Sequence, residues 1–504
     1  MLNKFMPFAM WCQKVLPLVY DDSLSYYEVI CKLMDSVNKV IESNLEIMEA
    51  LSELGGDTSL ETDYVTPEMF GGIGDGIADD TDALQSAIDS GKNVMLSMNK
   101  MYNIRRTIHL NAVPFDSEKR NRISRTIFSR AETNYNNSNA SITCKFATAD
   151  FPVFAIDAPN WTFDNVNINA LNQSSGNREL VLFKTNLEEV DVDFNLVNCF
   201  ISNAKQLIDF TGRGFLMQNC KTYAISNLID IKWKYESEAL FHNDTTGQRA
   251  IRIIGNRFHS NANNMANTGF ITLTSGNGYC LEFTDNCIDR GRSRFLRCLT
   301  TPYGWNISNN LLVGLWGNAT PGEDSLFTFE KGAENCIISN NRIVQSGEDD
   351  RWFRTVIFFG AGYNVKSCII TDNNVDNLRD GNFIIAPRGE DVHSAILYGC
   401  VVNNNAVELI SEMSSRRAII YGQNFEMHEC SVCGNTVGGY TTASGAGSDV
   451  KPFGVFIAHT TGNIYNCKII GNAIKDNPES LGYSGNVVLT KVNSITDGDL
   501  LTVI

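Results

Sequence analysis

Short apolar runs recur along most of the chain, each followed by an asparagine at a fixed place. Each unit has two or three apolar residues, then Gly, Asn, Asp or Ser, then Asn, one variable residue and a further apolar residue. The clear copies place this asparagine at Asn256, Asn286, Asn310, Asn341, Asn373, Asn405, Asn435 and Asn472. The steps between them are 30, 24, 31, 32, 32, 30 and 37 residues. Weaker copies at Asn165, Asn198 and Asn219 extend the series toward the N-terminus.

This repeat predicts an all-β chain with a parallel β-helix of about ten coils over residues 92–478. Coils of a β-helix stack about 4.8 Å apart. Equivalent asparagine amides would therefore form a hydrogen-bonded ladder at one tight turn. The uneven steps indicate loops of different length on one side of the helix. A propeller is disfavoured, because the Asn-Gly and Asp-Gly signals of its hairpins are not regularly placed.

The cysteines follow the same period. Cys336, Cys368, Cys400, Cys430 and Cys467 lie five residues before the asparagine of their coil, and Cys199, Cys220 and Cys287 lie one residue after it. Such columns are typical of small apolar side chains stacked in a core. Cys430 and Cys433 have the spacing of a zinc-ligand pair, but no second pair or histidine follows them. We therefore expect no metal and no cofactor, and folding in a reducing cytoplasm.

The N-terminal part has the pattern of one long helix over residues 24–55. Apolar side chains take heptad position a (Tyr27, Met34, Ile41, Met48), position d (Ile30, Val37 and Leu51, with Asn44 between) and position g (Leu33, Val40, Ile47, Leu54). Four heptads with charges on the outer positions predict a coiled coil. A stripe of three apolar positions is wider than a dimer needs and suits a trimer. The alternative is an amphipathic helix packed on its own domain.

These patterns divide the chain into five parts: residues 1–23, the coiled-coil helix 24–55, a linker and cap 56–91, the β-helix 92–478 and C-terminal cap strands 479–504. In the cap, the apolar residues of 82–90 fall on one face of a predicted helix, which Asp79 or Asp80 can cap. The glycine-rich stretch 71–76 lacks the lysine of a phosphate loop and predicts a tight turn.

Composition narrows the function classes. The formal net charge is −16, from 41 basic and 57 acidic residues. A nucleic acid or an anionic membrane surface requires excess Lys and Arg, so we expect neither as a partner. No run of 18 apolar residues predicts a spanning helix. The apolar start is interrupted by Pro7, Lys14 and Pro17, which disfavours a signal peptide.

The cap segment resembles the start of the pectate-lyase-like family common in bacteriophage tailspikes. The matching residues are Val65-Thr-Pro-Glu-Met-Phe-Gly71, Gly74-Asp-Gly76, Asp79-Asp-Thr81 and the stretch from Ala83 to Ile88. The opening, from Gln13 to Lys32, resembles the virion-attachment start of appendage and fibre proteins in phages of Gram-positive bacteria, which makes 1–23 an expected virion-attachment segment. The resemblance implies a right-handed β-helix closed by an N-terminal capping helix.

The same resemblance implies a function and partners. It implies a homotrimeric virion spike, assembled in the host cytoplasm and anchored through its N-terminus to phage tail or neck/portal proteins. Such a spike binds a host cell-wall or capsular polysaccharide during adsorption and in some cases cleaves it as a glycoside hydrolase or lyase. Two alternatives stay open, a purely structural head or tail fibre and a cellular polysaccharide lyase or hydrolase. The cellular enzyme should carry a signal peptide and lack the coiled coil.

Equal offsets from the asparagine anchors indicate a candidate site. Residues at one offset form a column in a β-helix, and the acids Asp349, Asp350, Asp380 and Glu412 lie seven to nine residues after successive anchors. Carboxylates one or two coils apart have separations suited to glycosidases, so these are the candidate catalytic residues. The candidate glycan-binding residues among the same loops are Trp316, Trp352, Arg351, Arg379, Arg416 and Arg417. The alternative is a set of solvated charge pairs on loops.

A second candidate is basic. Seven arginines lie between Arg249 and Arg297 (Arg249, Arg252, Arg257, Arg290, Arg292, Arg294, Arg297), with three acids among them (Glu282, Asp285, Asp289). This surplus could hold an anionic glycan such as teichoic acid, or the arginines could pair with acids between coils or subunits. The six histidines fall at unrelated offsets and predict no dyad.

Overall fold

A computed structural model describes most of the chain after residue 62. The described residues are 63–111, 124–130, 141–186, 191–232, 250–259, 269–276, 280–289, 295–315, 325–345, 355–360, 362–379, 382–385, 395–411, 417–422, 425–441, 454–459, 464–475 and 502–503. The predicted attachment segment and coiled coil lie outside them. No helix in the described part is long and apolar enough to cross a membrane.

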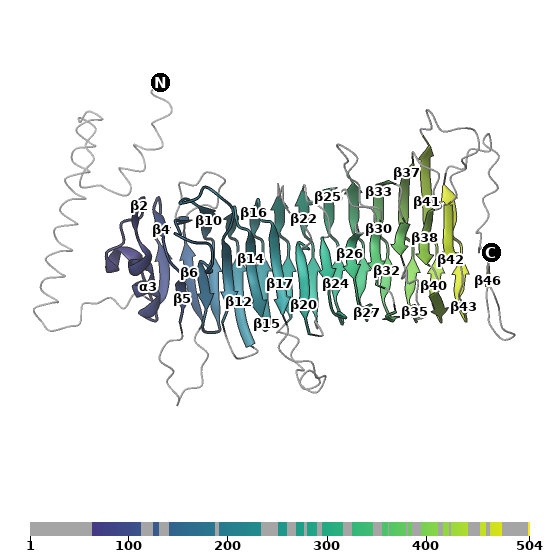
Figure 1. Cartoon of the computed structure of the whole chain (residues 1–504), viewed down its shortest axis with the longest axis horizontal. Coiled ribbons are helices and arrows are strands. Elements are labelled where there is room, and N and C mark those ends of the chain that lie inside the picture. Colours follow the sequence, from purple (N-terminus) through teal and green to yellow (C-terminus); the bar gives the residue numbers. More distant parts are fainter. Residues whose placement is uncertain are drawn as a thin grey trace, which may run out of the picture. The chain divides into compact units, whose positions relative to one another are not determined.

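Parallel strands stack along one axis from residue 64 onward, which confirms the predicted parallel β-helix (Figure 1). They form sheets of 15, 14, 12 and 5 strands, here called sheets A, B, C and D. In sheet B, for example, Arg342, Asn374, Ala406, Thr436 and Ala473 are partners on successive strands. The prediction of about ten coils was too low, because the first coils lack the asparagine that marked the others.

Sheet A contains, in order, β1 (Tyr64–Val65), β3 (Asn93–Leu96), β6 (Arg125–Ser129), β9 (Trp161–Asp164), β12 (Asp191–Val197), β15 (Arg213–Gln218), β18 (Ile251–Ile254), β21 (Leu281–Thr284), β24 (Asn306–Ser308), β28 (Ile337–Ser339), β32 (Ile369–Thr371), β36 (Val401–Asn403), β40 (Ser431–Cys433), β44 (Lys468–Ile470) and β46 (Thr502–Val503). Sheet B contains β2 (Asp75–Asp79), β4 (Met101–Ile104), β7 (Ser141–Cys144), β10 (Asn167–Asn172), β13 (Phe200–Ser202), β16 (Lys221–Tyr223), β19 (Arg257–His259), β22 (Cys287–Asp289), β25 (Leu311–Leu315), β29 (Arg342–Gln345), β33 (Asn374–Arg379), β37 (Ala406–Ser411), β41 (Thr436–Thr441) and β45 (Ala473–Lys475).

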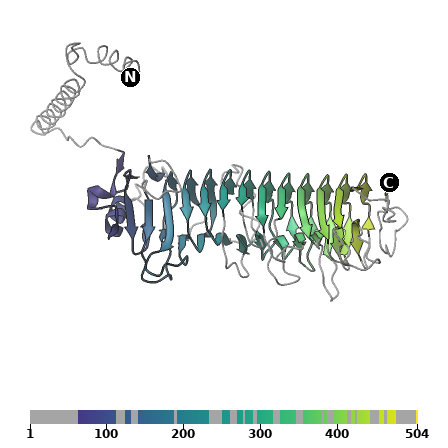
Figure 2. The same cartoon turned by 90° about the horizontal axis from the view of Figure 1, so that it is seen from above.

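Sheet C contains β5 (Ile108–Leu110), β8 (Phe154–Ile156), β11 (Val181–Thr185), β14 (Gln206–Thr211), β17 (Asn227–Lys232), β20 (Ile271–Ser275), β23 (Leu296–Cys298), β26 (Ser325–Phe329), β30 (Thr355–Phe359), β34 (Asn382–Ile385), β38 (Arg417–Gly422) and β42 (Gly454–His459). Sheet D adds β27 (Ala333–Glu334), β31 (Val365–Lys366), β35 (Ala395–Tyr398), β39 (Phe425–His428) and β43 (Ile464–Tyr465) to the later coils. Figure 2 shows the same stack from a second direction.

A two-residue turn joins sheet A to sheet B on every coil from β9 onward. Its first residue is left-handed throughout, with φ between 53° and 68°. This position is occupied by Asn165, Asn198, Asn219, Gly255, Asp285, Asn309, Asn340, Asp372, Asn404, Gly434 and Gly471. Gly, Asn and Asp are the residues that adopt this conformation with the least strain. The variable loops therefore lie at the other corners, after sheet B and after sheet C.

The second residue of the turn forms the predicted asparagine ladder. Asn373 Nδ2 donates to Asn405 Oδ1 at 2.9 Å and to the carbonyl of Ile338 at 2.9 Å. Its Oδ1 accepts from the main-chain N–H and the Nδ2 of Asn341 at 3.2 and 2.9 Å. The same pattern runs from Asn256 to Asn472. The side chain thus satisfies buried polar groups of its own and neighbouring coils.

The weaker copies of the repeat were assigned one residue out of phase. Asn198 and Asn219 occupy the left-handed position, and the ladder position beside them is taken by Cys199 and Cys220. The main-chain N–H of Cys220 donates to Asn256 Oδ1 at 2.8 Å, so the ladder begins there. Cys287 follows its ladder asparagine and is half-buried on sheet B, so it is not a member of that column.

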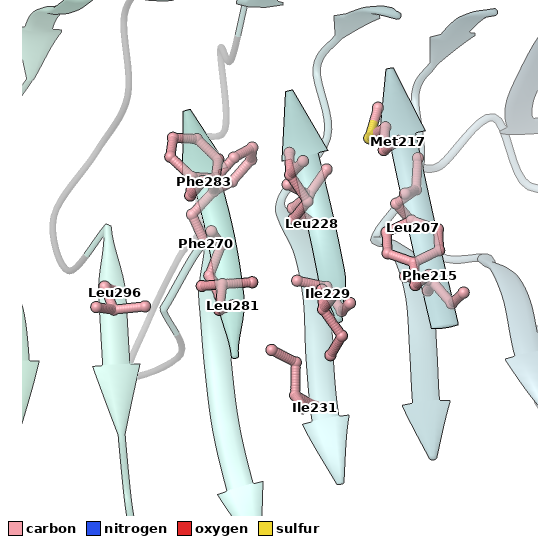
Figure 3. Packing of buried hydrophobic residues seen from close by; sticks show 14 of the residues in the cluster. Leu207, Phe215, Met217, Leu228, Ile229, Ile231, Phe270, Leu281, Phe283 and Leu296 are labelled. Atoms are coloured by element: carbon pink, nitrogen blue, oxygen red, sulfur yellow. The ribbon is translucent and has the colours of Figure 1, made fainter. Parts of the chain in front are cut away.

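Aromatic and aliphatic side chains fill the interior of the coils. Phe154 and Phe183 stack at 5.2 Å between ring centroids, and Phe163 packs edge-on against Phe154 at 5.1 Å. Figure 3 shows the next part of the core, with Phe215 and Leu281 of sheet A and Ile229 of sheet C among the buried side chains. Such packing removes large apolar surfaces from water and supplies most of the stabilising free energy.

The predicted cysteine column forms the corner between sheets D and A. Cys336, Cys368, Cys400, Cys430 and Cys467 are at most 2% exposed and lie in line behind Trp305. All five are free thiols. The hydrogen bond with the thiol of Cys368 raises the pKa of Cys400 to about 12, and Cys400 does the same for Cys430. Cys400 and Cys430 are therefore protonated packing groups.

A short cap closes the first coil. It consists of a 3-10 helix, η2 (Pro67–Phe70), and a helix, α3 (Thr81–Asp89). Asp79 Oδ1 accepts the main-chain N–H of Thr81 at 3.1 Å. Asp80, which is buried, instead accepts the N–H groups of Ile73 and Asn103. The predicted helix and its acidic turn are present, and Asp80 fixes the glycine-rich loop to the second strand of sheet B.

The ladder predicts a large loss of stability for Asn373→Leu. The change leaves several buried polar groups of residues 338, 341 and 405 without partners, at about 1–3 kcal/mol each. We expect the free energy of unfolding in urea, followed by fluorescence, to fall by several kcal/mol. Asn374→Leu, one residue later on the exposed face, is the matched control and should change stability little. Equal losses in the two variants would contradict a special role for the ladder.

The cysteine column predicts selective thiol labelling. At pH 8, thiols with pKa near 12 carry almost no thiolate, and burial blocks access. Iodoacetamide should therefore alkylate the exposed Cys280 well before Cys400 or Cys430, with peptide mass spectrometry as the readout. In urea all three should label alike. Rapid labelling of Cys400 in the folded protein would show that the column is open.

Candidate functional site

The edge between sheets B and C carries connections of very different length. From β9 onward, two-residue turns join sheets A and B, whereas the connections from sheet B to sheet C range from two residues, 380–381 after β33, to twelve residues, 442–453 after β41. Strands β25, β29, β33 and β37 are neighbours in sheet B, and β26, β30, β34 and β38 are neighbours in sheet C (Figure 1). Connections that leave neighbouring strands and return to neighbouring strands begin and end at one edge of the β-helix.

All the predicted acids belong to these connections. Asp349 and Asp350 lie between β29 and β30, Asp380 lies between β33 and β34, and Glu412 lies between β37 and β38. These four residues, with Trp316, Trp352, Arg351 and Arg416, lie outside the described residues. Arg379 and Arg417 are the last residue of β33 and the first of β38. The anchoring strands are adjacent, and the proposed carboxylate pairing stays a prediction.

A second group of candidate residues lies on the outer face of sheet B at this edge. Tyr223, His259 and Asp289 are the last residues of β16, β19 and β22 and are register partners across three coils. The rings of Tyr223 and His259 stack in parallel at 5.5 Å between centroids. His259 Nδ1 lies 3.0 Å from Asp289 Oδ2. Because a carboxylate accepts hydrogen bonds, this contact orients the imidazole and leaves Nε2 for another partner.

Basic side chains accompany this line. Lys221 and Arg257 lie two residues before Tyr223 and His259 on the same strands and are exposed. Residues i and i+2 of a strand point to the same face. The face therefore presents an aromatic ring, an imidazole, a carboxylate and two cations together. It can stack on a sugar ring and hydrogen-bond to its hydroxyl or acidic groups.

The sequence contained a signal for this group that was missed. His259 and Asp289 both lie three residues after their ladder asparagines, and Tyr223 lies three residues after Cys220. The equal offsets predicted above are those of acidic residues alone, and Asn219 is counted there as the ladder residue in place of Cys220. The prediction that the histidines form no dyad was therefore wrong. His109 and His428 also contact carboxylates, those of Asp157 and Glu426.

The arginine-rich stretch does not form one patch in the described residues. Arg252 Nε donates to Glu282 at 2.7 Å on sheet A, and Arg297 Nε donates to Glu330 at 2.7 Å on sheet C. Arg257 is on sheet B. Arg249, Arg290, Arg292 and Arg294 lie outside the described residues. Two of the three described arginines thus pair with acids of the next coil, which was the structural alternative to a glycan site.

Another pair of stacked acids is neutralised by a lysine. Asp209 and Asp230 are register partners in β14 and β17. Lys232 Nζ lies 2.6 Å from Asp209 Oδ1 and 3.4 Å from Asp230 Oδ2. Burial opposes the charge of this lysine, but the two carboxylates raise its pKa. A salt-bridged pair of this kind is a structural feature and not a free acid–base pair.

Comparison with known proteins shows the fold of the chain. No family model matches the chain. The fold is that of the tailspike protein of E. coli bacteriophage HK620, a double mutant of which gives a TM-score of 0.51 at 11% identity, covering 82% of this chain and 78% of that one. The Dettilon tailspike protein covers 82% of this chain and 68% of its own, at 17% identity and a TM-score of 0.35.

The chain also resembles a phage protein in sequence. The chain is 41% identical over 80 residues to a depolymerase of Klebsiella phage K64-1 that is specific for capsule K30/K69. This match covers 15% of the chain and 10% of the relative. The chain thus has the parallel β-helix fold of a phage tailspike and matches about a tenth of the length of a phage capsule depolymerase.

Proposed function

We propose that this chain is a virion spike of a bacteriophage and binds a host cell-surface glycan during adsorption. The observation that carries the proposal is the line Tyr223–His259–Asp289 at the sheet B–C edge of a tailspike-type β-helix. A rigid edge with aromatic, basic and acidic groups at a regular spacing suits a polymer of sugars. Because the strands fix these groups before binding, little conformational entropy is lost on contact.

The relatives support the class of ligand. A tailspike with the same fold was solved in complex with a pentasaccharide, and the Klebsiella phage relative is a capsule depolymerase. We therefore propose a cell-wall or capsular polysaccharide as the ligand of this chain. The spike would be a homotrimer, attached to tail or neck/portal proteins through residues 1–23 and assembled in the host cytoplasm.

Cleavage would use carboxylates of the same edge. Asp349, Asp350, Asp380 and Glu412 leave neighbouring strands of sheet B, and a pair one coil apart has the spacing of a retaining glycosidase. One carboxyl group would protonate the leaving oxygen while the other attacks the sugar or activates water. Trp316 and Trp352 would supply faces for the sugar rings, with Arg351, Arg379, Arg416 and Arg417 beside them.

The test of cleavage is incubation with purified host wall or capsular polymers, with fragments detected by mass spectrometry. Asp380→Asn or Glu412→Gln should lower cleavage by about 10²–10⁴-fold, the contribution of general acid–base catalysis, and leave binding intact. Cleavage that survives both changes would eliminate this column as the catalytic site. Binding without cleavage of any polymer would support a spike that only adsorbs.

Binding itself is tested on whole host cells with fluorescent protein. Trp316→Ala and His259→Ala should each weaken binding, because a sugar loses a stacking face or a hydrogen bond. Tyr363→Ala is the matched control, since this exposed ring lies between β30 and β31, away from the sheet B–C edge. A chain that binds no host cell would favour the structural-fibre alternative.

Assembly gives a separate prediction. The apolar stripe of residues 24–55 should hold three chains together in parallel. Light scattering on the full chain should report three times the mass of one chain, and deletion of residues 1–55 should release monomers. A trimer that survives the deletion would place the contacts on the β-helix flanks. A full-length monomer at micromolar concentration would contradict the homotrimer.

A further inference from the structure

A cavity of about 520 Å³ lies at the N-terminal end of the same edge. It is formed by α3, by the β4–β5 connection with the start of β5, and by the β7–β8 connection. The volume falls in the usual range of small-molecule sites, about 300–1,000 Å³. In sheet B, β4 is four strands from β16, which is about 19 Å at the usual inter-strand spacing. The cavity is therefore separate from the line Tyr223–His259–Asp289.

Two hydrogen-bonded networks hold its polar side chains in place. His109 Nδ1 lies 2.6 Å from Asp157 Oδ2, and Asn186 Nδ2 donates to Asp157 Oδ1 at 3.0 Å. On the other side, Asp89 Oδ1 accepts from Gln85 Nε2 at 3.0 Å and from Asn111 Nδ2 at 2.8 Å. Gln85 also bonds both main-chain groups of His109, at 2.8 and 2.9 Å. These contacts tie α3 to the first strand of sheet C.

Several polar atoms at the cavity remain available to a ligand. Since Asp157 accepts a hydrogen bond, the neutral imidazole of His109 carries its proton on Nδ1 and a lone pair on Nε2. The second carboxylate oxygen of Asp89 and the side-chain oxygen of Asn111 are acceptors with no partner in the described residues. Arg105 uses one amino group on the carbonyl of Ile77 at 2.7 Å, which leaves further N–H donors.

The apolar part of the cavity is an exposed aromatic ring. Phe151 is 63% exposed, whereas Phe146 beside it is buried. A single exposed apolar side chain is common on protein surfaces, so the groups around this ring decide its role. The ring lies among fixed donors and acceptors, which is the arrangement that accepts the apolar face of a pyranose ring.

From this combination we infer that the cavity is a second carbohydrate site, which binds one hexopyranose unit against Phe151 with hydroxyl groups on His109 Nε2, Asp89 and Arg105. Mixed donors and acceptors suit hydroxyl groups, because each hydroxyl both donates and accepts. An anion would need donors alone, and Asp89 would repel it. The inference rests on the proposed glycan function and adds a site that is independent of the loop acids.

The experiment uses the full chain and an array of immobilised bacterial surface oligosaccharides, followed by titration with the methyl glycosides of the sugars that bind. Phe151→Ala and His109→Ala should each weaken methyl glycoside binding about tenfold, equivalent to about 1.4 kcal/mol. Phe70→Ala, an exposed phenylalanine of η2, is the matched control and should bind as the unmodified chain does. Circular dichroism checks that the variants fold.

A protection assay locates the ligand directly. Diethyl pyrocarbonate should modify His109 at Nε2, and the bound methyl glycoside should slow this reaction while His259 reacts at an unchanged rate. Unchanged binding in both variants, or no protection of His109, would overturn the second site and leave the edge as the glycan site. A chain that binds no sugar on the array and no host cell would overturn the site together with the proposed function.

Discussion

The hydrogen bond between one buried asparagine and the next is the interaction on which the β-helix depends from β18 onward. It is made at the turn between sheets A and B, where a left-handed residue reverses the chain and the following side chain points inward. In this place the amide meets both the next amide and a main-chain carbonyl, so few polar groups remain unpaired. A turn that needs a left-handed residue followed by an inward-pointing asparagine has a fixed length of two residues. All turns between sheets A and B have this length from β18 onward, where the ladder runs.

The constant turn between sheets A and B leaves the connections after sheets B and C free to vary in length. Insertions after sheet B or sheet C change neither the ladder nor the core, because both are built from the strands. The entropic cost of a longer surface loop rises only slowly with its length. The sheet B–C edge can therefore vary in loop length while the strands that anchor it stay about 4.8 Å apart. Function and stability are thus assigned to different corners of the same coil.

The sequence predicted the constant turn between sheets A and B more accurately than the variable connections between sheets B and C. The spacing of Asn310, Asn341 and Asn373 was sufficient for the ladder, because a turn with two constraints tolerates few residue types. The assignment of the ladder position was wrong at Asn198 and Asn219. There a cysteine takes the place of the ladder asparagine, and the left-handed residue is itself an asparagine. The two positions look alike in the sequence and differ only in which way the side chain points.

The offset from the ladder residue also explains why the sequence indicated the loop acids and not the group Tyr223, His259 and Asp289. Acids at offset seven or more fall in connections of unequal length, so a common offset there does not guarantee a common position. His259 and Asp289, at offset three, lie within strands where the hydrogen-bonded register does guarantee it. The pairs Arg252–Glu282 and Lys232–Asp209 follow the same rule, yet they serve the stack rather than a ligand. An equal offset from the ladder residue therefore identifies side chains that are neighbours in the structure. The groups that these side chains contact decide their role.

A stack of parallel coils can combine several weak contacts with one polymer. Each sugar contact on an exposed face contributes little, but a polymer that meets several of them loses its translational freedom only once. Tyr223–His259–Asp289 and the cavity beside Phe151 lie at the same edge and are separated by strands in hydrogen-bonded register. Because the spacing between them is set by the paired strands of sheet B, a chain of sugars that reached both would need no rearrangement of the protein. The strand pairing that stabilises the fold thereby also sets the distance between the two proposed sites.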